Sequence, residues 1–158
     1  ASIASSMGSV PSGVAGGSQL DSAKSPCQLA AMTVAADDAP YHAHIYFSDH
    51  ERRAAEALKG QFELDPHILF VGRMTEGKAG PHPIPQNEVH FRKRSRDAVL
   101  ERIEASGLRA LVHPLTDDDM ADHTSLAHWV GEPVELDLAT LDPPGVNQGV
   151  PRFGKSDF

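Results

Sequence analysis

Cysteine is almost absent from this chain of 158 residues, which contains Cys27 alone. A single thiol can form neither an internal disulfide nor a thiolate cluster for a metal. Basic residues are also scarce, since 14 lysines and arginines stand against 22 aspartates and glutamates and give a formal net charge of −8. This balance argues against a protein that binds nucleic-acid backbones, which usually has a basic face. No apolar run is long enough to span a bilayer, and we expect a cytoplasmic protein without nucleic-acid or membrane partners.

The length of the chain suits one domain with one hydrophobic core. Residues 1–39 are rich in Ser, Gly and Ala with almost no periodic pattern, which predicts a flexible leader or an expression remnant. Dense hydrophobic periodicity over residues 40–143 predicts the folded domain. The Pro- and Gly-rich residues 144–158 predict an irregular C-terminal tail.

Within the folded domain, the patterns predict the order β-α-β-β-α-β. Ser48 and Glu51 have capping-box spacing before the first helix, and Gly107 is a natural stop for the second. An extra helix that stops at Gly131 and a short extended piece follow. The order predicts an α+β, ferredoxin-like antiparallel sheet with both main helices on one face. The expected strands are 41–47, 67–74, 87–92, 108–113 and 133–138, and the expected helices are 49–64, 96–106 and 116–130.

Histidine, by contrast, is abundant, with nine residues. His42 and His44 lie two positions apart in the first expected strand, on the same face as Tyr46. Ala43 and Ile45 occupy the opposite face and suit a core. Because paired imidazoles on one rigid face can hold a metal or relay protons, this strand is the first candidate for a functional site.

The usual strand order 4-1-3-2 brings more histidines to this strand. We take strand 1 as antiparallel to strand 4 and parallel to strand 3, which places its start beside the end of strand 4 and the start of strand 3. His113 ends strand 4, His82 lies in a rigid Pro-His-Pro loop before strand 3, and His123 lies on the helix after strand 4. With His42 and His44, these residues are expected at one edge of the sheet.

The remaining histidines have simpler interpretations. His90 faces the open side nearer the middle of the sheet, and both a structural and a functional role stay open for it. The other three are expected to be ordinary polar residues, namely His50, His67 and His128.

Four segments resemble the DOPA 4,5-dioxygenase family of fungal and bacterial type: YHAHIYF (41–47), GPHPIP (80–85), LVHP (111–114) and DHTSLAHWVGEP (122–133). The resemblance extends in order over residues 41–143. It implies iron(II)-dependent extradiol opening of a catechol ring with O₂, in a ferredoxin-like domain that pairs as a homodimer. Departures at residues 75–79, 92–107 and 117 leave the substrate open, with DOPA as one candidate.

This chemistry needs protein ligands on one side of the metal and open positions opposite. We expect His44, His82 and His113 to bind iron(II), and His42 and His123 to transfer protons, although His42 and His44 could exchange roles. Zinc or nickel could occupy the site in purified protein, because the affinity order of divalent metals does not favour iron(II).

Four further residues are expected near the metal. Glu88 is the nearest candidate for a carboxylate ligand, and Asp122 is expected to orient His123 or a ligand imidazole. Arg73 could pair with a carboxylate of the substrate, and Tyr46 could line the pocket for its ring.

Two other functions stay open from the residues. One is a non-catalytic, dimeric module that binds a metal or a small ligand. The other is a cofactor-free enzyme in which His42 and His44 only transfer protons.

Overall fold

The structure is a computed structural model that describes residues 36–155. Cys27 and most of the predicted leader lie outside the described residues. The β-α-β-β-α-β order is confirmed, and further short helices and a fifth strand follow it. Among residues 36–155 no helix has the length and apolarity needed to cross a membrane. The elements are β1 (Pro40–Tyr46), α2 (Arg52–Glu63), β2 (Ile68–Val71), β3 (Gln86–Arg92), α3 (Arg96–Ser106), β4 (Arg109–Pro114), α4 (Asp119–His123), β5 (His128–Val130) and α5 (Gly149–Arg152), with 3₁₀ turns at Lys93–Ser95 and Leu138–Thr140.

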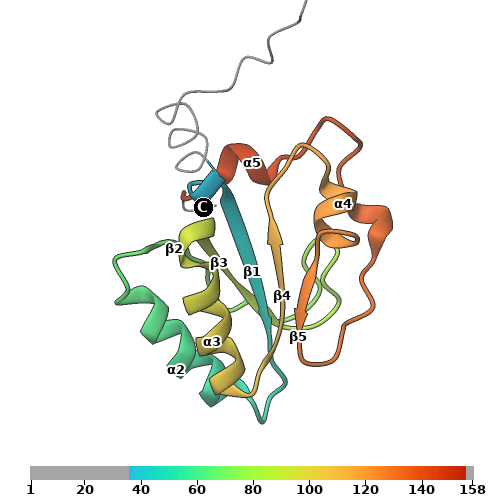
Figure 1. Cartoon of the computed structure of the whole chain (residues 1–158). Helices are drawn as coiled ribbons and strands as arrows, with labels where there is room; N and C mark the ends of the chain where they lie inside the picture. Colours follow the sequence, from blue (N-terminus) through green and yellow to red (C-terminus); the bar gives the residue numbers. More distant parts are fainter. Residues whose placement is uncertain (1–35, 156–158) are drawn as a thin grey trace, which may run out of the picture.

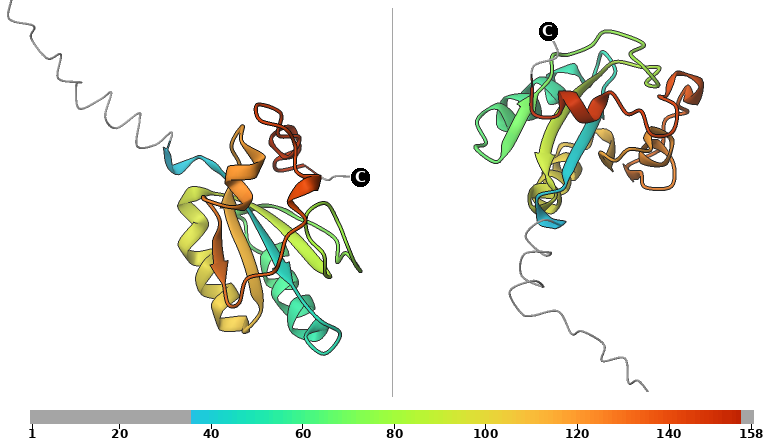
Figure 2. Two further views of the ribbon diagram at one scale, coloured as in Figure 1. Left: turned by 90° about the vertical axis from the view of Figure 1, so that its right-hand side faces the viewer. Right: turned by 90° about the horizontal axis from the view of Figure 1, so that it is seen from above.

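The five strands form one antiparallel sheet in the order β2-β3-β1-β4-β5. The helices α2 and α3 lie side by side on one face of this sheet (Figure 1). The expected α+β, ferredoxin-like architecture is therefore confirmed, and β1 lies at the centre of the sheet. The opposite face is partly covered by α4 and by the C-terminal segment, as the two rotated views show (Figure 2).

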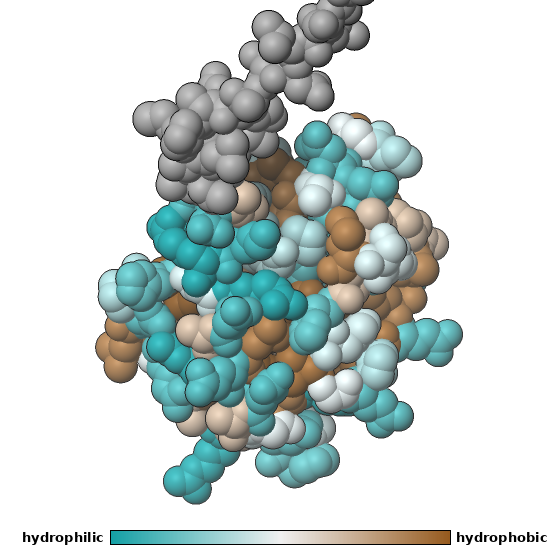
Figure 3. Space-filling view, in the orientation of Figure 1, coloured by the Kyte–Doolittle hydropathy of each residue, from teal (hydrophilic) through white to brown (hydrophobic). Residues whose placement is uncertain are grey.

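The hydrophobic core lies between the sheet and the two long helices. Ala43 and Ile45 of β1 are fully buried there, and they meet Leu58 and Phe62 of α2 and Ile103 of α3. Mostly hydrophilic side chains cover the outer side of these helices (Figure 3). The two faces of β1 follow the predicted alternation: one face packs in the hydrophobic core, and the opposite face carries the histidines.

The predicted stop of α3 is confirmed, but the predicted capping box before α2 forms only in part, because the N-cap of α2 is Glu51 and no side chain caps this helix. The backbone N–H and the hydroxyl of Ser48 both donate to Glu51 Oε2, at 2.9 and 2.5 Å. Gly107 ends α3 in the left-handed region, at φ 74°. Both ends are thus set by residues a few positions apart in the chain.

The expected parallel alignment of the first and third strands is wrong. The register pairs Pro40 with Arg92 and Tyr46 with Gln86, so β1 and β3 are antiparallel. The physical reason is connectivity: α2 returns the chain so that β2 runs in the direction of β1, and β3 then reverses beside β2. The start of β1 therefore lies beside the end of β3, and the loop before β3 reaches the site from the other end of β1.

The expected helix over residues 116–130 is also wrong, because α4 ends at His123. Thr124 leaves the helical region, with φ −125° and ψ −86°. His128, Trp129 and Val130 instead form β5, which pairs with the free edge of β4. An aromatic and a β-branched residue suit this edge. The piece expected as a strand over 133–138 forms no strand, and the tail after residue 143 contains α5.

Candidate metal centre

The open face of the sheet carries a cavity of about 520 Å³, a volume that suits a small organic ligand. Its walls come from β1, β3 and β4, from the loop before β3, from α4 and from the C-terminal segment. Charged and imidazole side chains line it, namely His42, His44, Arg73, His82, Glu88, His113, Asp119, His123, Asp142 and Arg152.

Five histidines line this cavity and a sixth, His90, stacks on one of them, and each of the six is at most 8% exposed. The elements that carry them are β1 (His42, His44), the loop before β3 (His82), β3 (His90), β4 (His113) and α4 (His123). The structure therefore brings together all five histidines expected at the site and adds His90. By contrast, His50, His67 and His128 are exposed.

The candidate ligand atoms fall into three groups, each with all its atoms within 4.8 Å of one another. Two groups are trios of histidines that share His44, and the third contains Glu88. The expected trio of His44, His82 and His113 is not among these groups in residues 36–155. The groups are His42 with His44 and His113, His44 with His82 and His123, and His42 with Glu88 and His90.

The rings of the first trio are evenly spaced. The centroid distances are 6.0 Å between His42 and His44, 5.5 Å between His42 and His113, and 5.4 Å between His44 and His113. In the second trio the rings of His44 and His82 are only 3.9 Å apart, whereas His123 lies 6.0 and 5.7 Å from them. Even spacing suits three rings arranged around one ion better than a close-packed pair does.

Backbone carbonyls fix the tautomers of two of these histidines. His113 Nδ1 lies 2.6 Å from the carbonyl oxygen of Pro114, and His123 Nδ1 lies 2.9 Å from that of Asp119. Because a carbonyl only accepts hydrogen bonds, each Nδ1 carries the proton and each Nε2 keeps a lone pair. This is the usual arrangement of histidine ligands, whose second nitrogen is held by an outer partner.

The group that contains Glu88 is a set of close polar contacts. Glu88 Oε1 lies 2.9 Å from His42 Nδ1 and 2.8 Å from His90 Nε2. The two imidazoles stack with centroids 4.0 Å apart and planes 7° from parallel. The N–H of Gly154 donates to His90 Nδ1 at 3.0 Å, so the proton of His90 lies on Nε2. A metal in this group would compete with that proton, and the first two trios are better candidates.

The cluster keeps its imidazoles neutral. Burial lowers the pKa of His44 and of His113 well below the ordinary value, and neighbouring histidines lower it further. Burial, followed by the neighbouring His123, lowers the pKa of His82 to about 3. Because only neutral imidazole binds a metal, these residues need to lose no proton when an ion enters.

Glu88 supplies the negative charge beneath the cluster. Burial alone would raise the pKa of this carboxyl group, but the contacts with His42 and His90 outweigh it and hold the pKa well below its usual range. The carboxylate is therefore ionised at neutral pH. It accepts a hydrogen bond from the Nδ1–H of His42, so that His42 Nε2 carries the lone pair.

Tyr46 supports His82 from beneath. Its hydroxyl oxygen lies 2.8 Å from His82 Nδ1, and its ring stacks on Trp129 with centroids 5.9 Å apart. Burial raises the pKa of this tyrosine, which stays protonated. Tyr46 does not line the cavity, so in this structure it holds His82 in place instead of contacting a bound ring.

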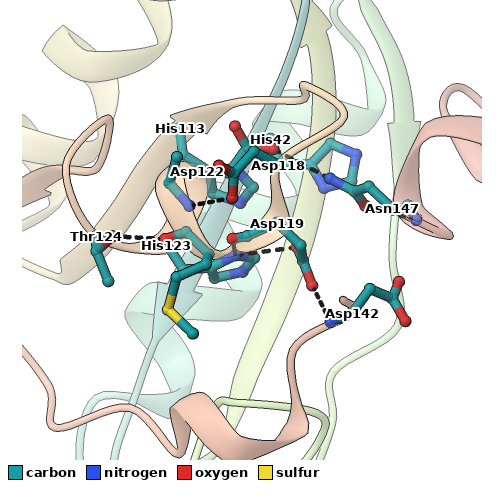
Figure 4. A network of polar contacts seen from close by, with 12 residues as sticks. His42, His113, Asp118, Asp119, Asp122, His123, Thr124, Asp142 and Asn147 are labelled. Carbon is teal, nitrogen blue, oxygen red and sulfur yellow. Dashed lines mark hydrogen bonds and ion pairs between the residues drawn. The ribbon is translucent and has the colours of Figure 1, made fainter. Parts of the chain in front are cut away.

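Asp119, and not the expected Asp122, is the aspartate of α4 that contacts His123. Asp119 lies beside His123, with Oδ1 3.2 Å from Nδ1, and its Oδ2 accepts the N–H of Asp142 (Figure 4). Asp122 is fully buried and accepts two hydrogen bonds from Thr116 and one from Asn147. Asp122 therefore secures the turn before α4, and Asp119 contacts the imidazole.

Sequence reasoning missed Asp119 and the contacts of the C-terminal segment, and it left the role of His90 open. Asp119 precedes His123 by four residues in a helix, so the i,i+4 spacing could have indicated it. Nothing local in the chain indicates that Gly154 reaches His90. Arg73, predicted to bind substrate, lies exposed at the cavity wall.

Two buried nitrogens test whether the cluster fits a metal. His42 Nε2 and His113 Nε2 are buried and have no hydrogen-bond partner among residues 36–155. The side-chain amide of Asn87 and His90 Nε2 share this property by hydrogen-bond geometry, but His90 Nε2 lies 2.8 Å from Glu88 Oε1. Buried polar atoms are normally paired, because an unpaired one costs about 1–3 kcal/mol. Both nitrogens carry lone pairs and belong to the evenly spaced trio. A cation bound by His42, His44 and His113 would satisfy both, so the residues present fit a metal.

Comparison with known proteins shows the family of the chain. A sequence model described as the Dopa 4,5-dioxygenase family matches residues 41–140. The DOPA 4,5-dioxygenase of Amanita muscaria is 32% identical over 114 residues, which are 64% of this chain and 49% of the relative. An uncharacterised 21.2 kDa protein of Botryotinia fuckeliana is 34% identical over 117 residues, 64% of this chain and 62% of the relative. The chain thus spans about half to three fifths of these curated relatives.

A solved structure shares the fold. The crystal structure of a candidate dioxygenase from Nostoc punctiforme superposes with a TM-score of 0.61 at 29% sequence identity. The superposition covers 66% of this chain and 91% of that one. The similarity therefore extends over nearly the whole of the solved relative.

Proposed function

This chain belongs to the Dopa 4,5-dioxygenase family, and from this premise we propose that it is a non-haem iron(II) enzyme that opens a catechol ring by extradiol cleavage. In the proposed reaction both atoms of O₂ enter the product, a ring-opened semialdehyde that carries the new carbonyl and carboxyl oxygens. The catechol is the reductant, so no further electron donor is needed.

The pair of buried, unpartnered nitrogens carries the proposal. We assign His42, His44 and His113 as the protein ligands, since His42 Nε2 and His113 Nε2 have no other partner among the described residues. The Nδ1 atoms of His42 and His113 are held by Glu88 and by the Pro114 carbonyl. Compared with the sequence-based expectation, His42 takes the place of His82 as a ligand.

His82 and His123 are the proposed proton-transfer residues. Both line the cavity, and their rings lie 3.9 and 6.0 Å from that of His44. Asp119 holds His123 through Nδ1, and Tyr46 holds His82. A fixed neutral imidazole can take a proton from a catechol hydroxyl and return it to the product.

Iron(II) at this position would supply the redox chemistry by which O₂ reacts with an electron-rich ring. The protein contributes neutral ligands, the partly buried carboxylate of Glu88 beside them and a cavity with walls on several sides. Arg73 at the cavity wall is the proposed partner of a carboxylate on the substrate. The substrate class is therefore a catechol, with DOPA as one member, and we keep the expectation of a homodimer as part of the proposal.

Metal loading tests the ligand assignment. Protein stripped with chelator and reloaded with iron(II) without oxygen should bind one ion per chain, measured by elemental analysis. His42→Ala and His113→Ala should each lose that ion, whereas His82→Ala should keep it. The exposed His50→Ala is the matched control and should bind as the parent does. Full iron content in both His42→Ala and His113→Ala would refute the assignment.

Turnover tests the reaction. Air and a panel of catechols, with and without a carboxylate, are added to the iron-loaded protein while O₂ uptake and visible absorbance are followed. A coloured ring-opened product with one O₂ consumed per catechol supports the dioxygenase. Tight metal binding without turnover of any catechol favours the ligand-binding module, and turnover in chelator favours the cofactor-free enzyme.

A further inference from the structure

We propose that residues 147–154, here called the C-terminal strap, position the candidate metal centre: the N–H of Gly154 fixes His90, and His90 with Glu88 holds His42 in the tautomer that presents an unprotonated Nε2. The strap lies after the segment matched by the family model, which ends at residue 140. The link to a metal rests on the proposed function, but the tautomers can be measured without it.

The first step is the contact of the strap with His90. The N–H of Gly154 lies 3.0 Å from His90 Nδ1. A backbone N–H only donates, so His90 Nδ1 must accept and the neutral ring must carry its proton on Nε2. His90 is 1% exposed, so its ring is screened from solvent with the strap in place.

The second step passes from His90 to His42 through one carboxylate oxygen. His90 Nε2 and His42 Nδ1 lie 2.8 and 2.9 Å from Glu88 Oε1. An ionised carboxylate only accepts, so the proton of His42 lies on Nδ1. His42 Nε2, which has no partner among the described residues, is therefore the atom with the lone pair. The two imidazoles consequently have opposite tautomers although they are stacked in parallel.

The third step is ring packing by Phe153. Its ring stacks over His90, with centroids 5.7 Å apart and planes 9° from parallel, and it lies 6.1 Å from His42 at 16°. The guanidinium of Arg92 lies over Phe153, 4.9 Å from the ring centroid. Phe153 thus packs nearly parallel to both imidazoles and at a similar distance from each, so its removal would loosen the packing of this pair.

The other end of the strap is anchored beside α4. Asn147 Nδ2 donates to the Thr116 carbonyl and to Asp122 Oδ2, at 2.8 and 3.1 Å. A Cβ added to Gly149 would lie 3.1 Å from Leu115 Cδ1 and 3.8 Å from His42 Cε1, so the backbone there passes close to the site. The strap is therefore held at both ends, and the C-terminal segment crosses the open face of the sheet (Figure 2).

Nitrogen NMR of the metal-free full chain, with ¹⁵N-labelled histidine, tests the proposal at neutral pH. Two-bond ¹H–¹⁵N correlations should show His90 protonated on Nε2 and His42 protonated on Nδ1. Phe153→Ala should convert His42 to a mixture of tautomers. Val146→Ala, a tail substitution before the strap, is the matched control and should leave both rings unchanged.

Two substitutions of His90 separate positioning from packing. His90→Phe keeps a flat ring but removes the donor to Glu88, and it should release His42 to a tautomer mixture. His90→Gln places an amide N–H donor near the former Nε2 and should restore the Nδ1–H form of His42. Zn²⁺ affinity, measured by competition with a chromogenic chelator, should fall about 10–100-fold in His90→Phe and Phe153→Ala and about 3-fold or less in His90→Gln.

A parent-like His42 tautomer in both His90→Phe and Phe153→Ala would overturn the proposal. If His90→Phe fails to fold, Phe153→Ala still decides, because Phe153 is only partly buried. If the tautomers and their response to the substitutions are as expected but the protein turns over no catechol, the positioning role of the strap stands. That result would refute only the proposed function.

Discussion

Tyr46 shows how one buried hydroxyl can set the orientation of a functional side chain. It is 1% exposed, lies on the histidine face of β1 and has its oxygen 2.8 Å from His82 Nδ1. The hydroxyl contacts Nδ1 of His82, which leaves Nε2 of this ring for another partner. The interaction fixes His82 against rotation in a loop that prolines at positions 81 and 83 already restrict.

Removal of this hydroxyl should impair turnover and leave the metal in place. In Tyr46→Phe we expect kcat for a catechol substrate to fall about 10–100-fold, the usual effect of losing an outer partner of a site histidine. The iron content should stay at one per chain, and the free energy of unfolding should fall by about 1 kcal/mol. Steady-state oxygen uptake and elemental analysis provide the two measurements.

Tyr41→Phe is the control for this prediction. Tyr41 lies near the start of the same strand but packs against the core, beside Phe91. The same loss of a hydroxyl there should leave kcat within about 2-fold of the parent. Equal activities of Tyr46→Phe and the parent enzyme would show that His82 needs no support from Tyr46.

At the scale of elements, the connection between α4 and β5 matters most for the site. Because α4 stops at His123, the chain can return along β4 and add β5 to the sheet. Trp129 of β5 then packs on Tyr46, and so this edge strand braces the residue that holds His82. A longer helix, as the sequence pattern predicted, would have removed that brace.

Gly131 directly follows β5 and takes a left-handed conformation where the chain leaves this strand. It has φ +72°, and an added Cβ would lie 3.1 Å from Arg109 Cγ. Gly131→Ala should therefore lower the free energy of unfolding by about 1–2 kcal/mol, the cost of a left-handed non-glycine residue. Urea denaturation followed by circular dichroism measures the change.

Gly60→Ala is a matched substitution with the opposite expected sign. Gly60 lies within α2, and an added Cβ would meet no atom within 4 Å. Alanine there should raise the free energy of unfolding by about 0.5–1 kcal/mol, because glycine is a poor residue for a helix interior. Destabilisation of equal size by both alanines would contradict the assigned conformation of Gly131.

For the whole molecule, the buried cluster makes stability depend on pH. The folded pKa values of His44, His82 and His113 are lowered from 6.5, that of His82 to about 3, so protons bind to the unfolded chain first. Stability is then lost as pH falls below 6.5, by up to about 1.4 kcal/mol per pH unit for each histidine. Glu88, with a depressed folded pKa, stabilises above its unfolded value of 4.5 and loses that contribution at lower pH.

The metal-free protein should consequently be most stable above about pH 7 and lose stability steeply from pH 6.5 towards pH 3. Urea midpoints at a series of pH values measure this dependence. His82→Asn should make the slope between pH 6.5 and 5 shallower, and the surface variant His50→Asn should not change it. A free energy of unfolding that stays constant from pH 7.5 to 5 would contradict the neutral, buried state of these histidines.

The sequence by itself determined the elements and one face of the site. Alternation in β1 separated His42, His44 and Tyr46 from the core residues, and capping signals placed α2 and α3 to within a few residues. The expectation that the histidines of β1 meet His82, His113 and His123 in one site also agrees with the structure. These features depend on local periodicity and on element order, which neighbouring residues encode.

Only the tertiary structure decided which atoms face one another. Antiparallel pairing of β1 with β3 set His42 opposite His90 and His44 opposite Glu88, a register that the assumed parallel alignment did not contain. The folded-back tail brought Gly154 to His90, 64 positions away in the chain. Such contacts depend on strand direction and on packing between distant segments. The His-x-His strand therefore indicated a functional site. Residues far from it in sequence determine which nitrogen of each imidazole carries the lone pair.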